Sequence, residues 1–130
     1  MPVVPTQAIM LLEHPTLRNY NLESLRAIGI YGAALHYETG KKIEASLKAK
    51  VINFWGSHDC GIGIVTSIRK SQRVRLGTVG KPRPGSGDEI SIRGENDEVL
   101  PPGEVGEVWA RGPSCVSGYF FPFIKRHQCL

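Results

Sequence analysis

The chain has 130 residues, enough for one domain or for a piece of a larger one, and its 41% hydrophobic and 22% charged residues are ordinary for a globular protein. The net charge of +4 is too small to indicate a partner, and no secretion signal or apolar run long enough to span a bilayer is visible. Three cysteines, at positions 60, 115 and 129, fit neither a zinc-site spacing nor a disulfide scaffold, so we expect a reducing, cytoplasmic location.

Helix and strand patterns alternate through the first half of the chain. Pro5 and Thr6 predict the start of a short helix that continues to residue 13. A strand, a helix and a second strand are then predicted over 25–30, 37–47 and 50–54. Two strands joined by a single crossover helix run parallel in one sheet. The first half therefore predicts an α/β fold with a partial parallel sheet built on a βαβ crossover.

The predicted helix over 37–47 has one buried stripe and one weak position. Ile43 and Leu47 are four residues apart and should face the core together. Gly40 lowers the helix propensity of the segment.

The pattern changes after residue 67, where helical periodicity disappears and glycines and prolines separate short runs. Ile90 and Ile92 alternate with polar residues, which predicts a half-buried strand over 89–93. A turn at 94–97 then leads to a second strand over 105–111, so the two strands should pair antiparallel. The second half is therefore predicted to be rich in β-structure.

Six basic residues fall in a short stretch of this second half: Arg69, Lys70, Arg73, Arg75, Lys81 and Arg83. No aromatic residue lies among them, so nucleic-acid bases would find no stacking surface. We interpret the stretch as a solvated loop face and expect no nucleic-acid partner.

The segment Leu100–Pro113, followed by Gly118–Tyr119, carries the most specific pattern in the chain. Two prolines and a glycine predict a tight turn at 101–103, small apolar residues follow over 105–110, and Gly112–Pro113 ends the strand. The segment closely resembles the "PPGEvGEl..RGP....GY" stretch of the adenylate-forming enzymes, the superfamily of acyl-CoA synthetases, aryl-CoA ligases and luciferase. A generic β-hairpin with an acidic turn is the alternative interpretation.

Two further segments point to a ligand site. Tyr31–Leu35 follows the first predicted parallel strand, and Trp55–Asp59 follows the second. Parallel strands joined by one crossover place both turns at the carboxyl edge of the sheet, where α/β proteins bind ligands. Gly32 and Ala33 leave their backbone bare, and Trp55 offers an aromatic face, so the two turns could hold a flat ring between them.

The same segments resemble two motifs of the adenylate-forming superfamily. Tyr31-Gly32-Ala33-Ala34-Leu35 is similar to "GGAPL", whose backbone lies against the adenine of ATP or acyl-AMP in the family. Trp55-Gly56 is similar to the aromatic-glycine pair of "WGMTE", which closes the adenine site from the other side. The resemblance therefore implies that Tyr31, Gly32, Ala33, Ala34, Trp55 and Gly56 bind the nucleotide.

The resemblance also assigns catalytic roles to His58 and Asp59, with two substitutions. His58 stands where the family has a threonine that binds the α-phosphate, and a histidine donates strongly to phosphate only when it is protonated. Asp59 stands where the family has a glutamate that helps hold Mg²⁺. Its carboxylate is an oxygen ligand suited to Mg²⁺, but it is one methylene shorter.

Three other interpretations concern the same residues. Ser57, His58 and Asp59 are adjacent and point apart, which excludes a catalytic triad. His58 and Cys60 have the residue types of a metal-binding pair, but the sequence offers no second pair of ligands to complete a site. Trp55 as a core residue stays an open alternative.

The resemblance covers residues 3 to about 120 and implies an internal fragment of a longer ligase. Residues 1–67 would be the end of an α/β subdomain, 68–120 the start of a β-barrel subdomain, and 121–130 a divergent tail. The chain lacks the family's phosphate loop, its ribose-binding aspartate and its C-terminal catalytic lysine, so we expect it to be inactive alone.

The implied activity is that of an AMP-forming acid–thiol ligase. Its substrates would be a small carboxylic acid and ATP, with Mg²⁺ as cofactor, CoA as acyl acceptor and the rest of a ligase chain as partner. In the family, acyl specificity depends partly on residues matching Ile30–Tyr31 and 61–64. The alternative is a non-catalytic remnant or binding module.

Overall fold

The computed structural model describes residues 1–119, apart from the side chain of Ile62, and the predicted tail over 121–130 lies outside them. The chain divides into two compact units. The first comprises residues 1–55 and 64–81, and the second comprises 56–63 and the chain from 82 onward. The predicted subdomain boundary after residue 67 stays a prediction about the family's longer chain.

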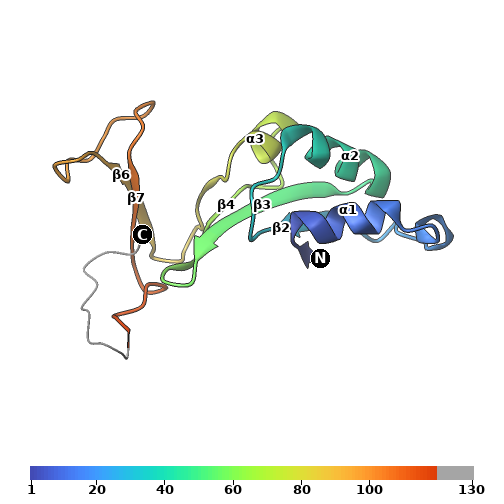
Figure 1. Ribbon diagram of the computed structural model, residues 1–130, viewed down its shortest axis with the longest axis horizontal. Coiled ribbons are helices and arrows are strands. Elements are labelled where there is room, and N and C mark those ends of the chain that lie inside the picture. The colour runs from blue at the N-terminus through green and yellow to red at the C-terminus, as the bar shows by residue number, and fades with distance from the viewer. Residues whose placement is uncertain (120–130) are drawn as a thin grey trace. The chain divides into compact units, whose positions relative to one another are not determined.

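A five-stranded sheet with the order β1-β2-β3-β4-β5 organises the first unit, and the ends of β3 and β4 continue into the second (Figure 1). The strands are β1 (Pro2–Val3), β2 (Ala27–Ile30), β3 (Lys50–Ser57), β4 (Gly61–Val65) and β5 (Lys81–Pro82). β1 and β3 both pair parallel to β2, with Ala27 opposite Lys50 and Ile30 opposite Asn53. This pairing confirms the predicted βαβ crossover and the mixed α/β class.

Helices of the first unit supply its core. They are α1 (Pro5–Glu13), the 3-10 turn η1 (Leu17–Asn19), α2 (Tyr37–Leu47) and α3 (Gln72–Gly77). Pro5 occupies the first turn of α1, where its missing N–H costs nothing, and the Val4 N–H donates to Gln7 Oε1 at 3.1 Å. Ile43 and Leu47 of α2 are fully buried, as predicted. They pack in one cluster with residues of β2, β3, α1 and α3 and of the connection before β3: Ala8, Ile28, Ile30, Ala49, Val51 and Leu76.

Helix α3 corrects part of the prediction that the basic stretch is a solvated loop face: five of its six basic residues are exposed, but residues 72–77 form a helix and Arg75 is buried. Leu76 is buried in the core, and the Arg75 side chain is only 5% exposed. Arg75 Nη2 lies 2.6 Å from Glu44 Oε1 on α2, while its other nitrogens donate to the carbonyl oxygens of Val51 and Lys70. Tertiary contacts of this kind stabilise a six-residue helix that has no periodic pattern of its own.

Glu44 is the acceptor at the centre of this network. Burial by itself raises the pKa of Glu44, but three hydrogen bonds and the Arg75 charge outweigh it and lower the pKa below its ordinary value. The donors are Arg75, Gln72 and the backbone N–H of Val51. One carboxylate therefore ties α2, α3 and β3 together.

The second unit contains an antiparallel ribbon of β6 (Glu89–Arg93) and β7 (Glu107–Arg111). Glu89 pairs with Arg111 and Arg93 with Glu107, which confirms the predicted antiparallel neighbours. The Arg93 guanidinium lies 4.2 Å from the centre of the Trp109 ring. Within residues 1–119 this ribbon does not close into a barrel, so the barrel-like subdomain stays a prediction.

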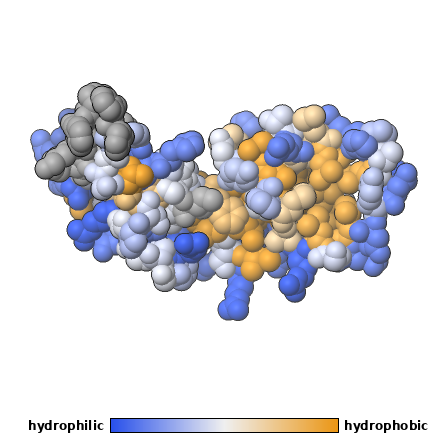
Figure 2. Space-filling model, turned by 90° about the horizontal axis from the view of Figure 1, so that it is seen from below, coloured by the Kyte–Doolittle hydropathy of each residue, from blue (hydrophilic) through white to orange (hydrophobic). Residues whose placement is uncertain are grey.

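The surface of the first unit is partly apolar. Figure 2 shows hydrophobic side chains gathered over it, and its exposed large hydrophobic residues include Met1, Ile9 and Met10. None of the helices between residues 1 and 119 combines the length and the hydropathy that a membrane crossing requires.

Candidate functional site

The turn after β2 presents bare backbone, as the sequence predicts. Tyr31, Gly32, Ala33 and Ala34 are all exposed. Gly32 has a φ of +81°, and a Cβ at this position would lie 3.3 Å from Val4 Cγ1. A larger residue would therefore have a strained backbone and would crowd Val4, the residue that precedes α1. The turn keeps a flat, accessible surface next to the end of a parallel strand.

Trp55 and Gly56 lie within β3 and not in a turn, which corrects the sequence interpretation. β3 continues to Ser57, four residues past Asn53, the last residue paired with β2. The extension exists because β4 continues the sheet on the other side of β3. The last residues paired between β2 and β3 are Ile30 and Asn53. Gly32 follows Ile30 by two residues, and Trp55 follows Asn53 by two residues.

Trp55 is half-buried. Trp55 is not among the described residues that form the core cluster or pack against it. The interpretation of Trp55 as a core residue therefore gains no support from the packing.

The turn after β3 holds the other two predicted residues, and it belongs to the second unit. Ser57 Oγ accepts hydrogen bonds from the backbone N–H groups of Asp59 at 3.2 Å and Cys60 at 3.3 Å. Cys60 is buried, so its side chain anchors the turn. His58 is exposed and Asp59 is half-buried. The turn thus leaves the imidazole in solvent and holds the backbone of Asp59 in place.

The segment 112–119 contacts this turn at two points. The Val116 N–H donates to the Asp59 carbonyl oxygen at 2.8 Å. The Tyr119 hydroxyl donates to Asp59 Oδ1. The contacts join residues 57 and 60 positions apart, and they place the end of the "RGP....GY" segment against the predicted metal ligand.

A second anchor fixes the same segment to the start of β6. Asp88 accepts from the Ser114 N–H at 3.2 Å and from the Ser114 hydroxyl at 3.0 Å. The backbone hydrogen bond from Ser114 is the main cause that lowers the pKa of Asp88, with help from the hydroxyls of Ser114 and Ser86. A Cβ on Gly112 would lie 2.5 Å from Asp88 Oδ1, so the close approach requires glycine there.

The chemistry of Asp59 fits a magnesium ion that is shared with a nucleotide. Mg²⁺ is usually held by one or two carboxylates, substrate phosphates and water, and not by a complete protein cage. Residues 1–119 contain no group of three or more side chains of the metal-binding kinds. Asp59 would supply a carboxylate to such an ion, and the Tyr119 hydroxyl donates to its Oδ1.

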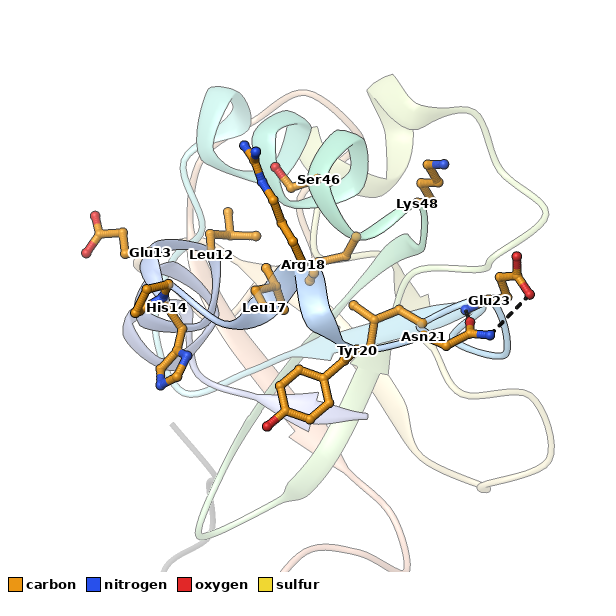
Figure 3. A pocket seen from close by; sticks show the side chains of 13 residues that line it. Leu12, Glu13, His14, Leu17, Arg18, Tyr20, Asn21, Glu23, Ser46 and Lys48 are labelled. Atoms are coloured by element: carbon orange, nitrogen blue, oxygen red, sulfur yellow. Dashed lines mark hydrogen bonds between the residues drawn. The ribbon is translucent and has the colours of Figure 1, made fainter.

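A large hollow of about 1120 Å³ lies elsewhere in the first unit, between the end of α1, η1 and the end of α2. Figure 3 shows that its charged side chains point in different directions: Glu13, Arg18, Glu23 and Lys48. Ligand sites need polar groups that converge on one point. The hollow therefore does not compete with the turns after β2 and β3.

Sequence reasoning missed the roles of Ser57, Asp88, Ser114 and Tyr119. Tyr119 was part of the recognised pattern, but nothing local in the sequence connects it with Asp59. The pairing of Asp88 with Ser114 also spans 26 residues. A signal was present only at Ser57, because a serine directly before a turn commonly accepts backbone N–H groups two or three residues later.

Comparisons with known proteins identify a family for the chain. A family model described as "AMP-binding enzyme" matches residues 1–120. The chain is 31% identical over 124 residues to the 4-coumarate–CoA ligase-like protein 9 of Arabidopsis thaliana, covering 92% of this chain and 21% of that protein. It is also 31% identical over 116 residues to the oxalate–CoA ligase of Saccharomyces cerevisiae, covering 89% of this chain and 20% of the relative.

A solved structure shows the same fold. The amide bond synthetase McbA from Marinactinospora thermotolerans superimposes with a TM-score of 0.80 at 30% identity, covering 92% of this chain and 24% of that one. The chain thus spans about a fifth of the length of the curated relatives it matches. With a family model matched over residues 1–120, this chain belongs to the AMP-binding enzyme family.

Proposed function

We propose that these residues form the adenine side of the nucleotide site in an AMP-forming acid–thiol ligase. The observation that carries the proposal is the placement of Gly32 and Trp55, each two residues beyond the last paired residues of adjacent parallel strands. The carboxyl ends of such strands are where α/β proteins bind ligands. Family membership and the names of the relatives, which are CoA ligases, support the same activity.

Each predicted residue has a defined part in this proposal. The backbone of Tyr31, Gly32, Ala33 and Ala34 lies against one face of adenine, and Trp55 and Gly56 close the other. His58, which is exposed, donates to the α-phosphate. Tyr31 narrows the acyl pocket, to which Ile30 and residues 61–64 also contribute.

The reaction begins when a substrate carboxylate attacks the α-phosphate of ATP and expels pyrophosphate, giving an acyl adenylate. A thiol such as CoA then takes the acyl group and releases AMP. Asp59 would hold Mg²⁺, which offsets negative charge on the phosphates when it is bound. The chain's own contribution is to position the base and to supply donors around the phosphate.

The proposal extends to the organisation of a longer chain. Residues 1–67 end an α/β subdomain, and 68–120 begin a barrel-like subdomain of which β6 and β7 are the first ribbon. The other strands of that barrel and the remaining nucleotide contacts come from the rest of the ligase. The 130 residues alone then bind nucleotide weakly and form no acyl adenylate.

Nucleotide titration of the 130-residue chain tests the adenine site. Trp109→Phe leaves Trp55 as the reporter, and we expect its fluorescence to change with AMP or ATP at millimolar concentration. Trp55→Phe, which leaves Trp109, is the matched control and should show no change. An unchanged Trp55 signal in a folded sample would mean that the stacking site does not operate.

Two substitutions favour the second candidate, a non-catalytic remnant or binding module. The family's threonine and glutamate are replaced by His58 and Asp59. Pyrophosphate exchange across a panel of carboxylic acids separates the candidates when the chain is joined to the missing parts of a ligase. Exchange above background supports the ligase, whereas nucleotide binding without exchange supports the binding module.

A further inference from the structure

The contact between Tyr119 and Asp59 joins two segments that the proposed function leaves unconnected. Asp59 is the only carboxylate of the turn over 57–60, and the Tyr119 hydroxyl donates to its Oδ1. Tyr119 is 44% exposed, so it is not a core residue whose hydroxyl merely needed a partner. The hydroxyl therefore acts on the orientation of the carboxylate and adds little to packing.

The backbone on both sides of this contact is held independently. On one side, Ser57 Oγ accepts from the N–H groups of Asp59 and Cys60, and the Cys60 side chain is buried. On the other, the Val116 N–H bonds to the Asp59 carbonyl oxygen at 2.8 Å, and Ser114 is fixed by Asp88. The hydrogen bonds that hold the two backbone segments do not involve the tyrosine hydroxyl. The hydroxyl therefore acts on the side-chain torsion of Asp59.

From this geometry we infer that Tyr119 is a positioning residue, which holds the Asp59 carboxylate in one rotamer for a Mg²⁺–nucleotide complex. The inference rests on the proposed function. Carboxylates that bind metals are commonly oriented by hydrogen bonds from outer residues. Such orientation matters for Asp59, because its side chain is shorter than the family's glutamate. A small misplacement of the carboxylate weakens the binding of Mg²⁺, which requires octahedral geometry.

Nuclear magnetic resonance of the labelled 130-residue chain tests the positioning directly. We expect the couplings between the α-proton and the two β-protons of Asp59 to have single-rotamer values in the unchanged chain, either one large and one small or both small. In Tyr119→Phe both couplings should move to intermediate, averaged values. Tyr20→Phe, which replaces an exposed tyrosine of the first unit, is the matched control and should keep the single-rotamer values. Averaged couplings in the unchanged chain, or single-rotamer couplings in Tyr119→Phe, would overturn the inference.

Metal binding supplies the second measurement. Mn²⁺, detected by electron paramagnetic resonance in the presence of ATP, should bind about tenfold more weakly to Tyr119→Phe, as expected when an outer hydrogen-bond partner of a ligand is lost. In an Asp59→Asn background the Tyr119→Phe change should have no further effect, because its action passes through the carboxylate. An equal loss in both backgrounds would show a merely structural role and overturn the inference.

The two measurements separate this inference from the proposed function. If the unchanged chain binds no Mn²⁺–ATP while the Asp59 couplings respond to Tyr119→Phe, the positioning contact stands and the nucleotide role fails. If Mn²⁺–ATP binds equally to the unchanged chain and to Tyr119→Phe, the nucleotide role stands and the positioning role fails. Amide spectra of each variant confirm that the chain stays folded.

Discussion

At the scale of single residues, the ion pair of Glu44 and Arg75 shows how strongly one substitution should act. Their side chains are only 11% and 5% exposed, so loss of either charge leaves the other uncompensated away from water. We expect Glu44→Gln to lower the free energy of unfolding by about 3 kcal/mol, measured by urea denaturation. Glu38→Gln, which removes an exposed pair with Lys41 on the same helix, should cost less than about 0.5 kcal/mol.

The same pair makes stability depend on pH. The pKa of Glu44 is lowered in the folded chain, so its stabilisation is complete above the ordinary value of 4.5 and is lost as the pH falls through the folded value. The difference between the unchanged chain and Glu44→Gln should therefore shrink when denaturation is repeated at progressively lower pH below 4.5. A difference that stays constant on acidification would contradict the assignment.

Gly80 offers a second residue-scale prediction. Its φ is +97°, and a Cβ there would lie 2.1 Å from the carbonyl oxygen of Val65. Gly85 has a similar φ of +78° but nothing within 4 Å of the same position. Gly85→Ala should cost about 1–2 kcal/mol for backbone strain alone, whereas Gly80→Ala should cost at least about 2 kcal/mol more. Equal effects in thermal denaturation would mean that the chain near Val65 yields easily.

At the scale of elements, Gly40 shows why a weak helix former stands inside α2. A Cβ there would lie 2.8 Å from Leu76 Cδ2 and 3.2 Å from Leu35 Cδ2, and Leu76 is buried. Overpacking costs about 1–3 kcal/mol and should exceed the helix-propensity gain of about 1 kcal/mol. We therefore expect Gly40→Ala to destabilise the chain by about 1 kcal/mol.

Gly77→Ala is the control for this prediction. Gly77 is the last residue of α3 and has nothing within 4 Å of an added Cβ. Its replacement should leave the midpoint of urea unfolding unchanged or slightly raised. A stabilised Gly40→Ala would show that the side chains of Leu76 and Leu35 move aside at little cost.

Elements that depend on local sequence patterns were predicted from the sequence, whereas elements that depend on contacts between distant residues were not. The bounds of α2 were predicted correctly because its buried stripe is a local pattern, and the parallel pairing of β2 and β3 followed from the single crossover. Helix α3 was missed because its stability comes from Glu44 and the core, more than 25 residues away. The extension of β3 through Trp55 was missed because β4, its partner, gave no clear pattern.

The candidate site divides in the same way. Bare backbone at Gly32 and Ala33 could be predicted, since it depends only on which residues follow β2. The contact of Tyr119 with Asp59 could not, because it depends on how the chain returns after 60 residues. Contacts of that range come from the fold and leave no trace in local composition.

At the scale of the whole molecule, the two units should differ in their ability to fold alone. All members of the core cluster lie between residues 8 and 76, in the first unit. The second unit has a two-stranded ribbon, which is marginally stable when isolated. A chain of residues 1–81 should therefore keep a cooperative unfolding transition by circular dichroism, whereas residues 82–119 should show no protected amides. Slow amide exchange in isolated β6 and β7 would contradict this expectation.

The buried pair of Glu44 and Arg75 also has an evolutionary consequence. Replacing Glu44 or Arg75 alone leaves the other charge buried without its partner. Selection should therefore favour replacement of both residues in a descendant that has lost one of them. The two positions lie 31 residues apart on different helices, yet they are expected to vary together among relatives, as an ion pair or as two apolar residues. Covariation at these positions would record a stability constraint and would carry no information about which acid a relative activates.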